Sequence, residues 1–213
     1  MFEEKIALIR SVIDRESSCT DSDLLLEQWV ADNRANLHRL IHIPEEKTNQ
    51  ALKQFVVRYV ALIPECLEAF YDISKRINIT DYSLMFLTIA ADFILSEKQC
   101  PSNGKGIVRL IDEAYLAHRV FEELNDRFNH AVGRPLLPVD TFQANLIMHD
   151  LLGDQYANEL DTAVLYAMEV NYEAEKRALS KLQPVPVEQL VTAIEMWPKL
   201  GEELFIHIKF MYE

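Results

Sequence analysis

The chain has 213 residues, of which 49% are hydrophobic and 26% are charged, and its formal net charge is −13. This composition suits a single globular domain over residues 1–213 with a sizeable core, and the negative charge disfavours contact with nucleic acid or with an anionic membrane surface. Only five glycines occur, which disfavours both an all-β fold with many tight turns and a glycine-rich phosphate-binding loop.

The three cysteines, Cys19, Cys66 and Cys100, are far apart in the sequence. This spacing is neither a disulfide framework nor a zinc motif, and it favours reduced thiols. The N-terminus is charged from its third residue and has no pattern of a signal peptide, and the longest apolar stretch, residues 84–95, is too short to span a bilayer. We therefore expect a soluble cytoplasmic protein.

Apolar residues recur at helical spacing through the first half of the chain. The pattern predicts a helix over residues 2–15, with Phe2, Ile6, Ile9 and Ile13 on one face. Thr20 or Asp21 is expected to cap a second helix, which includes Leu37 and Leu40 and stops before Pro44. A long segment over residues 46–77 is expected to kink or break at Pro64, and Thr80 is expected to cap a helix over residues 81–97.

The second half has the same character. After a loop at residues 101–106, the longest well-patterned helix is predicted over residues 105–131 and ends before Gly133. Asp140, with Gln143 at capping-box spacing, begins a short helix that ends at Gly153. Further helices are predicted over residues 155–182, 187–196 and 201–212. With eight to ten helices and short connections, the predicted fold is an all-α multi-helix bundle with a single core.

The most informative residues are charged groups on apolar helix faces, because a buried charge needs a partner or a metal ion. Asp92 follows a run that is apolar on every side of a helix, so we expect it to lie among buried neighbours. Glu113 falls at the edge of the apolar stripe of the 105–131 helix. Together they predict a polar centre inside the bundle.

One side of the 105–131 helix is more polar than the other. His118, Glu122 and Asp126 are spaced four apart and therefore stack along one side, with Tyr115 and Arg119 beside them. Two interpretations stay open. The strip is either a solvated face with ion pairs between neighbouring turns, or the wall of a cleft.

Carboxylates and histidines occur on four of the predicted helices, as a metal site in a helical bundle requires. The candidate ligands are Glu113, His118, Glu122 and His149, with Asp92 as a ligand or as a residue that orients one. Such a donor set suits a divalent or iron-type metal, namely iron, manganese or zinc. The paired Glu-x-x-His motifs of ferritin-like di-iron proteins are absent, which counts against that family. Glu65 and Glu68 follow Pro64, where a helix start would favour carboxylates without any chemistry.

No sequence motif specifies a reaction, so the sequence does not decide whether the protein is an enzyme. Cys66 is flanked by acids, which should raise the pKa of its thiol and make it a poor nucleophile. The sequence favours a binding or regulatory module without nucleic-acid contact, and the alternative is a metal-binding helical bundle, including a metal-dependent enzyme. A small-molecule pocket between helices is a third alternative. A last helix that does not fold back would offer its apolar face to a homodimer or another protein partner.

Overall fold

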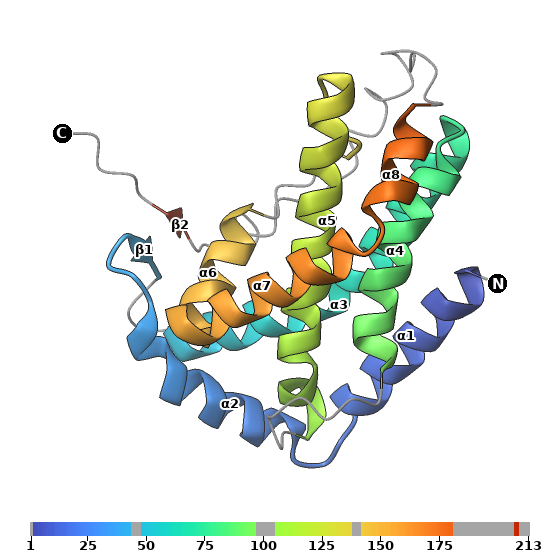
Figure 1. Cartoon of the computed structure of the whole chain (residues 1–213). Helices are drawn as coiled ribbons and strands as arrows, with labels where there is room; N and C mark the ends of the chain where they lie inside the picture. The colour runs from blue at the N-terminus through green and yellow to red at the C-terminus, as the bar shows by residue number, and fades with distance from the viewer. Residues whose placement is uncertain (1, 44–47, 97–104, 138–141, 181–206, 209–213) are drawn as a thin grey trace.

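The computed structural model describes residues 2–43, 48–96, 105–137, 142–180 and 207–208, and these ranges are almost entirely helical. Eight α-helices pack together (Figure 1): α1 (Phe2–Ser17), α2 (Ser22–Asn33), α3 (Thr48–Arg76), α4 (Thr80–Leu95), α5 (Ile111–Val132), α6 (Phe142–Leu152), α7 (Asp154–Glu169) and α8 (Tyr172–Leu179). The described residues also form two 3-10 helices, η1 (Arg34–Asn36) and η3 (Gly106–Leu110), and two short strands, β1 (Ile41–His42) and β2 (His207–Ile208). The predicted all-α multi-helix bundle is confirmed.

Helix α5 lies at the centre of the bundle and contacts α3, α4, α6 and α7 (Figure 1). Its predicted apolar stripe is buried along its whole length: Leu110, Ala114, Ala117, Phe121, Leu124 and Phe128. The helix ends at Gly133, whose φ of 81° is left-handed and whose N–H bonds to the carbonyl of Asn129 at 2.7 Å. Because α5 touches four other helices, side chains on different sides of it meet different partners.

The buried apolar side chains of the described residues form one continuous cluster. Aromatic rings join α5 to its neighbours: Phe70 of α3 stacks on Phe121 with ring centroids 5.4 Å apart, and Tyr82 of α4 lies 6.2 Å from Phe128. Burying a side chain of this size contributes about 2 kcal/mol. These contacts hold α3 and α4 against the central helix α5.

A close contact joins η3, at the start of the α5 segment, to α2. The Oγ atom of Ser22 accepts a hydrogen bond of 3.0 Å from the backbone N–H of Ile107. Gly106 has a φ of +66°, and a Cβ atom there would lie 2.4 Å from the same Oγ. Glycine is therefore required at position 106 both by its backbone conformation and by the nearness of α2.

Three helix boundaries in the first half differ from the predictions. Helix α2 ends at Asn33, so Leu37 and Leu40 lie outside it. The Asn33 side chain donates to the carbonyl of Trp29 at 2.7 Å, which competes with the helix, and the backbone N–H of His38 is drawn to Asp150 of α6. Helix α3 has no break at Pro64, because one lost hydrogen bond is outweighed by the burial of the helix on both sides of it. Helix α4 has Ile79, not Thr80, at its N-cap.

The second half differs in two places. The single helix predicted over residues 155–182 is two helices, α7 and α8, because the chain leaves helical geometry at Asn171, a poor helix former. Residues 207–208, predicted as helical, form β2, which pairs antiparallel with β1. That pairing depends on a distant segment, so local periodicity does not reveal it. The Asp140 cap, residues 101–104 of the predicted loop, the predicted helix over residues 187–196 and the rest of the last helix lie outside the described residues.

Candidate functional site

Asp92 is not part of a polar interior. Its side chain is 58% exposed and makes an ion pair of 2.6 Å with Lys5 of α1. The expectation that Asp92 has buried neighbours is wrong, because α4 packs on its neighbours through Phe86, Ala90 and Ile94 and leaves the Asp92 side toward solvent. Asp92 therefore lies at the surface of the bundle, where its charge is met by Lys5.

Glu113 is buried, as predicted, and only 4% of it is exposed. It lies in the first turn of α5 beside Asp112, which is also buried and accepts a hydrogen bond of 2.7 Å from the hydroxyl of Tyr156. Backbone N–H groups and the helix dipole favour carboxylates in a first turn. This position gives Glu113 a structural reason for its burial that needs no metal ion.

His118 is buried between helices and not in a cleft. Its Nε2 atom lies 2.8 Å from the backbone carbonyl of Tyr59, and its ring lies against the Tyr59 ring with centroids 4.0 Å apart. A carbonyl oxygen only accepts, so Nε2 carries the proton and the lone pair is on Nδ1. Burial lowers the pKa of His118 to about 4, so the imidazole is neutral at physiological pH.

The other side of the α5 strip does face a cleft. A cavity of about 290 Å³ is lined by residues of α5, α6 and α7, and we call it the polar pocket: Tyr115, Arg119, Glu122, Phe142, Asn145, Leu146, His149 and Asp161. The interpretation of the strip as a cleft wall therefore holds for Tyr115, Arg119 and Glu122. It does not hold for His118, which is buried elsewhere, or for Asp126, which is exposed.

A continuous chain of side-chain hydrogen bonds forms the wall of the polar pocket. The hydroxyl of Tyr59 donates to Asn145 Oδ1 at 2.7 Å, and Asn145 Nδ2 donates to Glu122 Oε2 at 2.6 Å. The same Glu122 oxygen accepts from Arg119 Nη1. The chain thus runs from α3 through α6 to α5.

The chain continues to α7. Arg119 Nε donates to Asp161 Oδ1 at 2.8 Å, and the hydroxyl of Tyr115 donates to the same oxygen at 3.0 Å. Four helices therefore contribute to one set of contacts, and each carboxylate has one oxygen, Glu122 Oε1 or Asp161 Oδ2, that accepts no hydrogen bond from the described residues. These two oxygens are acceptors that a ligand can use.

The charges of the polar pocket hold one another in place. The pKa of Arg119 is raised: burial alone would lower it, but the carboxylates of Glu122 and Asp161 outweigh burial. The pKa of Tyr115 is also raised, first by burial and then by Asp161, so its hydroxyl stays a donor at neutral pH. Two carboxylates face one guanidinium, so the carboxylates outnumber the guanidinium in the lining.

No protein-family model, curated protein or solved structure matches this chain. None of the described helices combines the length and the apolarity that crossing a membrane requires.

His149, one of the predicted metal ligands, lies where the polar pocket meets the junction of α6 and α7. Its Nδ1 atom is 3.7 Å from Asp154 Oδ1, and possible ligand atoms of His149, Asp150 and Asp154 all lie within 4.8 Å of one another. Asp150 also accepts the hydrogen bond of 2.7 Å from the His38 backbone. In the described part of the chain, no group of this kind includes Asp92, Glu113, His118 or Glu122.

Three residues of the hydrogen-bonded chain were neither predicted metal ligands nor part of the polar strip of α5: Tyr59, Asn145 and Asp161. The spacing of the sequence could have identified Asp161. It lies four residues after Ala157 and three before Val164, and so falls on the buried stripe of α7. Tyr59 carried none, because a tyrosine in an apolar stripe looks like any core aromatic residue. Only the fold shows that its hydroxyl meets Asn145.

The remaining candidates have structural roles. Cys66 is buried, and burial, with a further contribution from Glu65, raises the pKa of its thiol to about 12, the direction expected from the sequence. Glu65 does not cap a helix, because Pro64 lies inside α3. It accepts from Arg58 at 2.9 Å, and Glu68 accepts from Arg10 at 2.6 Å.

Proposed function

We propose that this protein is a binding module for a small amine-bearing organic molecule, held in the polar pocket, and that it makes no contact with nucleic acid. The observation that carries the proposal is the hydrogen-bonded chain from Tyr59 to Asp161, which holds the charged groups in place around a cavity before any ligand arrives. A site whose polar groups are already positioned loses little entropy when it binds.

The charge of the lining favours a cation. Glu122 and Asp161 outnumber Arg119, and each carboxylate keeps one oxygen that accepts nothing from the described residues. An ammonium group can donate to these oxygens, whereas a carboxylate ligand would meet the net negative charge of the lining.

The rim of the polar pocket is apolar. Phe142 is 53% exposed and Leu146 is 37% exposed, and both line the cavity from α6. Contact with these side chains stabilises the hydrocarbon part of a ligand by about 25 cal/mol for each Å² of apolar surface removed from water. The ligand class is therefore an amine with an apolar portion, small enough for about 290 Å³.

Phenethylamine is the probe that tests this function. Phenethyl alcohol and phenylacetate have a matched shape and serve as its neutral and anionic counterparts. We expect phenethylamine to raise the melting temperature of the wild-type protein, and its effect to be lost in Glu122→Gln. Asp126→Asn is the matched control, because it removes one carboxylate from the same helix at an exposed position. An amine that fails to bind, or that binds equally to both variants, contradicts the proposal.

Divalent-metal binding is a second candidate function, favoured by the cluster of His149, Asp150 and Asp154. One imidazole and two carboxylates form a donor set that suits manganese, iron or zinc. We expect metal analysis of the purified protein to find about one ion per chain under this alternative.

The test of the alternative is calorimetric titration with Mn²⁺ and Zn²⁺. Asp154→Asn should weaken metal binding, and it leaves amine binding intact because Asp154 is not part of the polar pocket. Asp126→Asn again serves as control. A protein purified without metal that cannot be reconstituted with iron, manganese or zinc rules this alternative out.

A further inference from the structure

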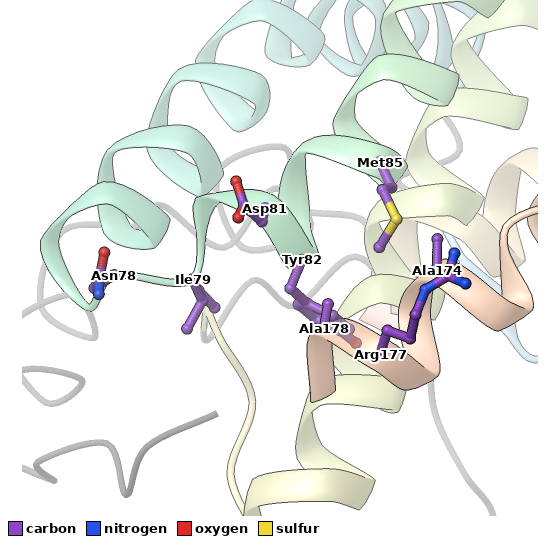
Figure 2. Close-up of a pocket in the computed structure, with 8 residues that line it drawn as sticks. All are labelled: Asn78, Ile79, Asp81, Tyr82, Met85, Ala174, Arg177 and Ala178. Atoms are coloured by element: carbon purple, nitrogen blue, oxygen red, sulfur yellow. The ribbon is translucent and has the colours of Figure 1, made fainter. Parts of the chain in front are cut away.

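A second cavity lies on a different side of the bundle, between the start of α4 and α8 (Figure 2). Its volume is also about 290 Å³. Ile79, Tyr82 and Met85 line it from α4 and the residue before it, and Arg177 and Ala178 line it from α8. We call it the α4–α8 pocket. No residue of the polar pocket contributes to it.

Tyr82, which lines this pocket, has an unusual hydroxyl group. The residue is 1% exposed, and its hydroxyl is buried with no hydrogen-bond partner in the described structure. In Figure 2 the side chain extends from α4 toward Ala178 of α8. Buried hydroxyl groups in proteins are nearly always hydrogen-bonded, so an unpaired one beside a cavity points to a partner from outside the described residues, such as a ligand.

The hydroxyl of Tyr82 keeps its proton at neutral pH and therefore has a hydrogen bond to donate. Its pKa is raised, first by burial and then by the charge of Glu175. Glu175 is itself paired with Arg127 at 2.6 Å, a contact that ties α8 to α5 and holds this wall of the pocket in position. A hydrogen-bond acceptor in the pocket would use this proton, and an oxygen of an anionic group is one such acceptor.

The second polar feature of the pocket is Arg177. It makes no ion pair with any described residue, in contrast to Arg119, which pairs with two carboxylates. Figure 2 shows its side chain running along α8 toward Ala174, while Asp81, which also lines the pocket, is drawn on the other side of Tyr82. Arg177 is thus a cation that can meet an anionic group in a cavity with a mixed polar and apolar lining, to which Asn78, Asp81 and Ala174 also contribute.

We propose that the α4–α8 pocket is a second ligand site, which takes a small organic carboxylate whose charge is met by Arg177 and whose oxygen accepts the hydrogen bond of Tyr82. The hydrocarbon part of the ligand lies against Ile79, Met85 and Ala178. This site is independent of the polar pocket and prefers the opposite ligand charge.

The test uses hydrocinnamate as probe, with binding measured by isothermal titration calorimetry. A probe of this size binds with a dissociation constant on the order of 1 mM. Tyr82→Phe removes only the hydroxyl and is expected to weaken binding about fivefold to tenfold, and Arg177→Gln about tenfold. Lys176→Gln is the matched control, because it removes a positive charge from the adjacent, exposed position of α8, and it should leave the affinity unchanged.

A second measurement concerns the ligand-free protein. Because Tyr82→Phe removes an unpaired polar atom, its melting temperature should equal or exceed that of the wild type. A lower melting temperature would show that the hydroxyl already has a partner, and would overturn the proposal. So would hydrocinnamate that does not bind, or that binds both variants as tightly as the wild type. Glu122→Gln should not change the affinity for hydrocinnamate, so the proposals for the two sites are tested independently.

Discussion

The hydroxyl of Tyr59 and the side-chain amide of Asn145 are joined by a hydrogen bond of 2.7 Å, although 86 residues separate them in the sequence. Tyr59 also presents its backbone carbonyl to His118 and its ring to the same imidazole. One residue of α3 therefore links the buried histidine of α5 to the hydrogen-bonded chain of the polar pocket. The consequences of this link can be measured.

Asn145→Ala should destabilise the protein. The substitution leaves the hydroxyl of Tyr59 without its acceptor and one oxygen of Glu122 without its amide donor, and each loss is expected to cost about 1 kcal/mol or more. We expect the free energy of unfolding in urea to fall by about 2–3 kcal/mol in total. Asn158→Ala, at an exposed position of α7, should change it by less than about 0.5 kcal/mol. Equal effects of the two substitutions would mean that the chain contributes nothing to stability.

His118 should make stability depend on pH. Its pKa falls from 6.5 in the unfolded chain to about 4 in the folded protein, so the unfolded chain binds more protons between these values. The contribution of His118 to stability is then fully present above the pKa of the unfolded chain, and it is lost as pH falls toward the pKa of the folded protein. Between about pH 7 and about pH 5 the loss from this group is about 2 kcal/mol.

The contribution of His118 can be isolated with His118→Gln, which keeps an N–H donor for the Tyr59 carbonyl and does not titrate. Unfolding curves of both proteins at the two pH values give the difference directly. The variant should lose about 2 kcal/mol less than the wild type over this range. A variant with the same pH dependence as the wild type would show that His118 is accessible to protons in the folded state.

Gly106→Ala should be strongly destabilising for two reasons. The new Cβ atom would lie 2.4 Å from Ser22 Oγ, and alanine would have to adopt the left-handed φ of this position. Gly133→Ala is the control, since Gly133 also has a positive φ but a Cβ there would meet nothing within 4 Å. We expect about 1 kcal/mol for Gly133→Ala and at least about twice that for Gly106→Ala, measured by thermal unfolding. Equal losses would show that α2 and η3 separate easily.

Asp92→Asn should change the free energy of unfolding by less than about 0.5 kcal/mol. The ion pair with Lys5 is exposed on both sides, and such pairs contribute little. Chemical denaturation checks this, with Lys5→Gln as the partner substitution. A loss of several kcal/mol would indicate that Asp92 has the interior role that its sequence context suggested.

Much of the fold could be predicted because the residues that a helix buries recur at helical spacing in the sequence. Ile6, Ile9 and Ile13 mark the buried face of α1, and the stripe of α5 is buried as its spacing indicates. The errors lie where long-range contacts decide the outcome. The end of α2 depends on Asp150, more than 100 residues away in the sequence, and the short strand pair depends on residues 207–208 meeting β1.

The candidate site was predicted less well, for a related reason. A helical wheel shows that Tyr115, Arg119 and Glu122 share one side of α5, and the structure brings them into one pocket. It cannot show that His118, one residue before Arg119, points between α5 and α3. Nor can it show that α4, although its sequence is apolar on every side, has one exposed side, on which Asp92 lies.

The most direct test of the proposed function is chemical-shift mapping by NMR, with phenethylamine added to ¹⁵N-labelled protein. We expect shifts concentrated on the residues of α5 and α6 that line the polar pocket and around Asp161 of α7, and we expect these shifts to be lost in Glu122→Gln. Shifts scattered over the acidic surface, or unchanged in Glu122→Gln, would show that the amine binds by net charge alone and would contradict a ligand site in the polar pocket.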